Sequence, residues 1–276
     1  MAATSGRLSI MAQRESTPEH WRKLWTKRDI QDIYPASEIV IDNLLKATDA
    51  RGKRILEVGA GSGRDSIRLA GLGAEVYVLD YVPESLQVVA EQAKAAGVEL
   101  QCVQGDALDL PFQDDFFDAV FHQGLLEHFR TPRDEDLLRE NFRVLKPGGL
   151  VVVDVPQTFH PYTVIKKILI LMDKWFAGWE KQYTIRTLRA KVSGAGFEEI
   201  HAYGEWMRPS LFYRMLRELL WKLHLGKLPL QPPRIPVLGA MRDALRTTFQ
   251  PRAWAMWTFI TIGIVGRKPM GLSLIH

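Results

Sequence analysis

The stretch that most constrains the fold is 54–69, which reads RILEVGAGSGRDSIRL. Its apolar residues run into glycines at positions 59, 61 and 63, and a helical pattern follows at once. A buried strand, a glycine turn and a helix N-terminus in that order form a corner that holds a nucleotide-like ligand. Glycine suits the corner because the ligand approaches the backbone closely and the turn needs positive φ.

The spacing of the glycines separates two classes of ligand. A dinucleotide fingerprint requires G-x-G-x-x-G, but counting from the first or second glycine its last position is Arg64 or Ser66. Instead, Glu57 lies two residues before Gly59, and the glycines alternate. This arrangement suits a ligand with a cationic amino group and no pyrophosphate.

Two aspartates follow predicted strands. The run 74–80 is nearly continuously apolar, as parallel strands buried on both faces are, and it ends in Asp80. There Asp80 can accept two ribose hydroxyls, or it can cap the helix that begins near Pro83. The next predicted strand, 98–104, leads into Asp106, which can accept the exocyclic amine of adenine.

Further landmarks follow in order: a predicted strand at 117–122, Glu127-His128, and Lys-Pro-Gly-Gly at 146–149 before a strand at 150–155. Over 54–155 this series resembles the class I S-adenosylmethionine-dependent methyltransferases, near the ubiquinone and menaquinone biosynthesis branch. The resemblance implies an α/β fold with a Rossmann-like, doubly wound seven-strand sheet, mostly parallel with an antiparallel last strand. Here it carries helical cap insertions.

The resemblance also implies S-adenosyl-L-methionine as the cofactor. Glu57 would hold its methionyl amino group, Asp80 its ribose, and Asp106 with Ala107 its adenine. The implied cofactor-binding residues are Glu57, Gly59, Ala60, Gly61, Gly63, Asp80, Tyr81, Asp106, Ala107, His122 and Gln123.

A catalytic base is needed only where the acceptor is a hydroxyl that must lose its proton. His122, at the end of the fourth strand, and His160, after the fifth, are the candidates at the reaction side. Each also has a structural interpretation, and for His128 we expect a structural hydrogen bond.

We expect one methyltransferase domain over 1–276. It comprises N-terminal helices (1–50), a cofactor-binding core (51–156), a cap and helix (157–196), and the last two strands (197–268) with an insertion at 207–254. The N-terminal helix, 19–33, either covers the cofactor or packs on the sheet edge.

The insertion is basic and amphipathic. Between Met207 and Ala253 there are nine Lys and Arg residues but only Glu218 and Asp243 as acids. In 211–225 and again in 164–179, large apolar residues recur at helical spacing opposite charged ones. These helices either pack their apolar faces on the core, or also contact an anionic membrane and admit a lipophilic acceptor. Nucleic acid is not expected, because the basic residues alternate with aliphatic ones.

The sequence therefore predicts methyl transfer to oxygen or carbon of a small, hydrophobic acceptor: a quinone or phenol, a lipid or a related metabolite. The alternatives are an NAD-dependent oxidoreductase and a non-catalytic membrane-surface protein on the same fold. The single cysteine, Cys102, excludes a disulfide framework and a zinc-cysteine cluster, and we expect it to be buried and no metal to be bound. Without an apolar leader or an 18-residue apolar span, we expect a cytoplasmic protein that is at most membrane-associated; the oligomeric state stays open.

Overall fold

A computed structural model describes residues 17, 19, 21–22, 38–172, 174–175, 177–226, 228–232, 236–250 and 252–271. Its strands form one seven-stranded sheet in the order β3-β2-β1-β4-β5-β7-β6. They are β1 (Arg54–Val58), β2 (Glu75–Asp80), β3 (Gln101–Gln104), β4 (Phe117–Gln123), β5 (Leu145–Pro156), β6 (Glu198–Glu205) and β7 (Thr261–Arg267). Only β7 runs antiparallel to its neighbours. The predicted Rossmann-like sheet with an antiparallel last strand is confirmed.

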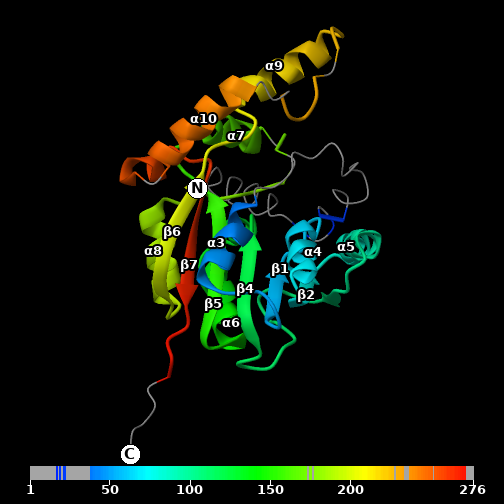
Figure 1. Cartoon of the computed structure of the whole chain (residues 1–276), viewed down its shortest axis with the longest axis vertical. Coiled ribbons are helices and arrows are strands. Elements are labelled where there is room, and N and C mark those ends of the chain that lie inside the picture. Colours follow the sequence, from blue (N-terminus) through cyan, green and yellow to red (C-terminus); the bar gives the residue numbers. More distant parts are fainter. Residues whose placement is uncertain are drawn as a thin grey trace, which may run out of the picture.

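Helices cover both faces of this sheet (Figure 1). On one face pack α3 (Ile39–Ala47), α4 (Arg64–Gly71) and α5 (Pro83–Ala96); on the other pack η2 (Leu126–His128), α6 (Arg133–Val144) and α8 (Ile185–Gly194). Beyond the carboxyl ends of the parallel strands lie α7 (Pro161–Leu171), α9 (Leu211–Lys222) and α10 (Pro236–Phe249), and η3 (Ala253–Trp257) returns the chain to β7.

The helix after β2 shows how local sequence sets an element. Pro83 occupies the first turn of α5, where a missing N–H costs nothing, and Gly97 ends the helix with φ +70°. Between them Leu86 and Val89 turn one apolar stripe toward the sheet. The first turn of α5 is therefore fixed beside the carboxyl end of β2.

The Lys-Pro-Gly-Gly segment lies inside a strand rather than before it. Leu145 pairs with Phe117 and Leu150 with Ala119, so the four residues between form a bulge in β5. Gly149 fits because a Cβ there would lie 2.8 Å from a backbone oxygen. The predicted start of this strand, at 150, was therefore too late.

The N-terminal segment crosses the carboxyl edge of the sheet where it is described. The ring of Trp21 lies 4.9 Å from that of His128, and Arg22 pairs with Glu84 at 3.1 Å. Most of the helix expected at 19–33 lies outside the described residues. Cys102 is exposed because β3 is an edge strand, so its predicted burial was wrong.

The cap helices are oriented differently from the prediction that their apolar faces pack on the core. On α9 the side chains of Phe212, Met215, Leu219 and Leu223 are 54–76% exposed, while Arg217 on the opposite face is 7% exposed. Within the described part of the chain, no helix is long and apolar enough to cross a bilayer.

Candidate cofactor and acceptor site

The three glycines of the turn all have positive φ: +79° at Gly59, +51° at Gly61 and +66° at Gly63. A Cβ at Gly63 would lie 2.6 Å from Val89, and one at Gly59 would lie 3.1 Å from Leu125. A Cβ at Gly61 would meet nothing within 4 Å. The outer two glycines thus allow the turn to pack on its own protein, and the middle one leaves a stretch of backbone open to a ligand.

Glu57 is held under this turn as a buried acid. Its Oε2 accepts a hydrogen bond of 2.5 Å from Ser66 Oγ, in the first turn of α4. Burial raises the pKa of Glu57 to about 8, and the bond from Ser66 opposes that rise. A ligand ammonium at this point would favour the ionised carboxylate.

Asp80 lies beside the turn, at the end of β2. Its oxygens accept hydrogen bonds from Val82 N at 2.8 Å and from Ser85 Oγ at 3.1 Å, so it does hold the start of α5. Burial raises its pKa, and the Ala60 N–H in the glycine turn partly offsets that rise. The helix-capping and ribose interpretations are therefore compatible, provided that ribose hydroxyls share these oxygens.

The loop after β3 lies beside the loop after β2. Gly105 N donates to Asp80 O at 3.1 Å, and Gln104 Nε2 donates to Tyr81 O at 3.4 Å. Asp106 is half-buried, and its Oδ1 accepts from Leu108 N at 2.9 Å, while Tyr81 is 53% exposed. The predicted ribose and adenine residues, including Ala107, thus gather at the carboxyl edge of β1, β2 and β3.

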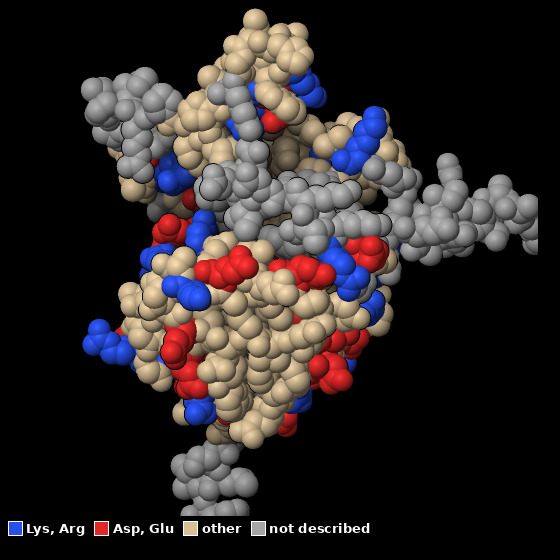
Figure 2. All heavy atoms as spheres, turned by 90° about the vertical axis from the view of Figure 1, so that its right-hand side faces the viewer, with Lys and Arg blue, Asp and Glu red and all other residues tan. Residues whose placement is uncertain are grey.

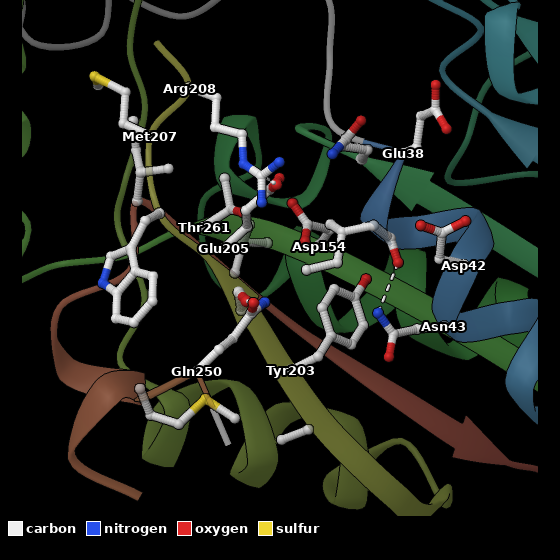
Figure 3. A pocket seen from close by; sticks show the side chains of 18 of the residues that line it. Glu38, Asp42, Asn43, Asp154, Tyr203, Glu205, Met207, Arg208, Gln250 and Thr261 are labelled. Carbon is white, nitrogen blue, oxygen red and sulfur yellow. Dashed lines mark hydrogen bonds and ion pairs between the residues drawn. The ribbon is translucent and has the colours of Figure 1, made fainter. Parts of the chain in front are cut away.

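A separate cavity of about 1480 Å³ adjoins the turn at Arg64, Gln123 and Gly124. It extends over the ends of β5, β6 and β7 toward the cap, where Arg208 and Gln250 line it (Figure 3). Its lining includes neither the glycines of the turn nor Asp80 and Asp106. The site therefore has two adjacent parts that meet at the end of β4.

The two candidate histidines follow or end their predicted strands, and each has structural surroundings. His122 is fully buried and is absent from the described cavity lining, and burial lowers its pKa to about 3. Strand alternation turns it to the face opposite Gln123. The Nδ1 of His160 instead accepts the Tyr162 N–H at 3.1 Å and caps α7. Their roles at the reaction side stay predictions. His128 has the expected structural bond, 3.2 Å from Nδ1 to Trp179 O.

Sequence reasoning missed several polar residues of the cavity. Glu127 and Asp154 are 3% and 1% exposed, and burial raises the pKa of both well above the usual range. Tyr203 lies beside Asp154 (Figure 3). A signal was present for Asp154, which is the only charged residue in the run 150–155.

Residues 56–153 match the family model of a methyltransferase domain. The demethylmenaquinone methyltransferase of Clavibacter sepedonicus is 42% identical over 102 residues, 37% of this chain and 40% of that protein. The ubiquinone biosynthesis O-methyltransferase of Azorhizobium caulinodans is 30% identical over 154 residues, 54% of this chain and 60% of that protein. The chain thus spans about half the length of these curated relatives.

Among solved structures, phosphoethanolamine N-methyltransferase 2 of Haemonchus contortus, in complex with S-adenosyl-L-methionine, superposes with a TM-score of 0.57. It is 20% identical, over 87% of this chain and 54% of that one, so it supports the fold alone. With the sequence matches, residues 56–153 are identified as a methyltransferase domain, on a fold that binds S-adenosyl-L-methionine in the Haemonchus contortus structure.

Proposed function

We propose that this protein transfers a methyl group from S-adenosyl-L-methionine to a small acceptor bound in the cavity beside the glycine turn. The observation that carries the proposal is the junction of the two parts at Gln123 and Gly124, where β4 ends between the turn and the cavity. Two reactants held on either side of this junction would be close and aligned, which is the main contribution that such a displacement needs.

The charges around the turn favour this cofactor. When bound, it supplies a methyl group on a positively charged sulfonium. Glu57 and Asp65 are buried beside the turn and Asp80 is half-buried there, so the three carboxyls favour a cationic ligand. The pyrophosphate of a dinucleotide would bring negative charge beside the same carboxyls, which repel it when they are ionised. This argues against the NAD-dependent alternative more strongly than the missing glycine does.

The residues have distinct proposed roles. Glu57 binds the amino group, the open backbone around Gly61 lies along the methionine and ribose, and Asp80 accepts from the ribose hydroxyls. Asp106 binds the adenine, with Ala107 and Tyr81 beside it, and Gln123 faces the junction. The acceptor is a quinone, phenol, lipid or related metabolite, and methylation is on oxygen or carbon.

Calorimetric titration with S-adenosyl-L-methionine tests this assignment. We expect saturable binding that Asp80→Ala weakens by about 1–3 kcal/mol, the cost of lost hydrogen bonds to a charged group. Glu91→Gln, an exposed change on α5, is the matched control and should leave affinity unchanged. Absence of binding by the wild type would sink the proposal, and tight binding of NADH in its place would favour the oxidoreductase.

We further propose that the cap contacts an anionic membrane surface. Besides the exposed apolar stripe of α9 there is a second stripe on α7, where Val164, Ile168 and Leu171 are 53–72% exposed. Exposed apolar surface of this extent marks an interaction site. In Figure 2 the upper part of the molecule is largely tan with blue groups, and red groups gather on the lower body.

Each helix holds a basic side chain inward, Arg217 on α9 and Lys166 on α7. Arg217 Nε donates to Leu228 O at 3.0 Å, and the guanidinium of Arg214 donates to Arg208 O at 2.7 Å. Lys166 on α7 is buried in an ion pair with Glu180. These bonds fix the apolar faces outward, and exposed Lys222 beside them matches an anionic surface.

Sedimentation with vesicles of phosphatidylcholine and phosphatidylglycerol tests the contact. We expect Phe212→Ser with Leu219→Ser, and separately Lys222→Glu, to reduce vesicle binding roughly tenfold. Lys94→Glu, an exposed change on α5, should not. Arg214 and Arg217 are unsuitable for charge reversal because their bonds hold the cap. No vesicle binding by the wild type, or a dimer that these apolar substitutions dissolve, would refute membrane contact.

A further inference from the structure

Four buried polar atoms without well-formed hydrogen bonds gather on the cavity. Among the residues that the structure describes, Glu127 Oε2, Asp154 Oδ2, Tyr203 Oη and Thr261 Oγ1 make no hydrogen bond of good geometry, although Gln123 and the Tyr203 hydroxyl lie close enough to the Asp154 carboxyl to oppose the rise of its pKa. All four residues line the cavity. Buried polar groups are almost always paired, so a cluster of unpaired ones beside a cavity points to a ligand that pairs them.

Strand register aligns two of these residues, Asp154 and Tyr203, with each other and with Gln123. Asp154 on β5 pairs with Gly263 on β7, which pairs with Tyr203 on β6. Gln123 on β4 pairs with Asp154 from the other side. Directly opposed residues share a face of the sheet, so Gln123, Asp154 and Tyr203 form one row across four strands.

Gly263 lies between Asp154 and Tyr203 in this row, and its lack of a side chain leaves room for the ring of Tyr203. A Cβ at this position would lie 2.1 Å from Cζ and 2.4 Å from Oη of Tyr203. The aromatic ring therefore crosses β7 and brings its hydroxyl toward Asp154 (Figure 3). Thr261 lies two residues before Gly263, on the same face, and adds a second hydroxyl at the mouth of the row.

We propose that Asp154, Tyr203 and Thr261 form a recognition site for a hydroxyl group on the acceptor. The carboxyl of Asp154 accepts the ligand O–H, and the hydroxyls of Tyr203 and Thr261 donate to the ligand oxygen. This inference rests on the proposed function and narrows it to hydroxyl-bearing acceptors. It gives Asp154, Tyr203 and Thr261 on the cavity wall a role in binding the acceptor.

The groups on the row match one hydroxyl better than the other polar ends a small molecule offers. A free carboxylate or phosphate would add a negative charge beside Asp154, whose pKa is already raised by burial and by the nearby Glu205. A hydroxyl needs one acceptor and up to two donors, which are the groups present. Ordered water satisfies the same groups, so the test must separate water alone from a ligand.

The test compares 4-methylphenol with 4-methylanisole at neutral pH, where the phenol keeps its proton, so that the two probes differ by the O–H donor. Equilibrium dialysis with the full chain is expected to show roughly tenfold tighter binding of the phenol, as one hydrogen bond provides. Asp154→Asn should reduce this preference to about twofold or less. Glu91→Gln should preserve it.

Thr261→Val provides a second variant if Asp154→Asn does not fold, and melting curves check both. It should reduce the preference partly, since Asp154 and Tyr203 remain. Equal binding of the two probes, binding of neither, or an undiminished preference in Asp154→Asn would overturn the proposal. Cofactor titration of the same variant keeps the two questions apart: Asp154→Asn should bind S-adenosyl-L-methionine like the wild type. Wild-type failure to bind the cofactor would refute the proposed function alone.

Discussion

Replacing Glu57 by Gln should make the protein more stable, and increasingly so as the pH rises. The folded chain raises the pKa of this carboxyl from 4.5 to about 8, chiefly by burial. Below pH 4.5 the group is protonated in both the folded and the unfolded chain. Between these values the unfolded chain releases a proton that the folded chain retains, so the wild type loses stability as the pH rises.

The size of the effect follows from the shift. One pKa unit corresponds to about 1.36 kcal/mol, so the full interval corresponds to on the order of 5 kcal/mol, approached above pH 8. Glu57→Gln removes the titration, and its free energy of unfolding relative to the wild type should therefore climb between pH 5 and 8 and then level.

Urea denaturation of both proteins at pH 5, 6.5 and 8, without ligand, measures this difference. Glu91→Gln, which replaces an exposed carboxyl on α5, should differ from the wild type by less than about 0.5 kcal/mol at each pH. A difference between Glu57→Gln and the wild type that does not change with pH would refute the reasoning. So would a difference that falls as the pH rises.

Two further changes test the packing around the site. Gly63→Ala should cost about 2–5 kcal/mol, because positive φ is joined by overlap with Val89, whereas Gly61→Ala has only the φ cost of about 1–2 kcal/mol; equal losses in urea denaturation would contradict this. Lys166→Met should cost about 3–5 kcal/mol in the same assay by leaving Glu180 buried without its cation, and a loss below about 1 kcal/mol would show that the pair is not buried as described.

The cofactor half of the site was predictable because its signals are local. A glycine turn between an apolar run and a helix fixes backbone angles within a few residues, and the positive φ values at Gly59, Gly61 and Gly63 follow from it. Asp80 and Asp106 follow strands of the same sheet, so parallel order places both at one edge. The fold was predictable for the same reason.

The acceptor half depends on distant residues. Asp154 and Tyr203 meet through Gly263 on a third strand, a pairing that no local pattern states. The sequence also left open which face His122 takes: it points to the face opposite Gln123, because successive residues of β4 alternate between the two faces of the sheet.

The sequence predicted that the cap helices are amphipathic, but not which face of each helix points toward the protein. A periodic pattern shows that α9 has an apolar face, without showing which way it points. The hydrogen bond from Arg217 to Leu228 O, eleven residues later in the chain, holds this basic side chain toward the protein.

Hydrogen exchange measured by mass spectrometry, with and without saturating S-adenosyl-L-methionine, tests the central claim most directly. The cofactor should slow exchange in segments 58–64, 80–82 and 105–108, which form one edge of the sheet. Exposed α9 is the internal reference and should not change. Protection of these three segments together is the predicted result. Protection confined to other segments, or none at saturation, would contradict the assignment of the glycine turn as the cofactor site.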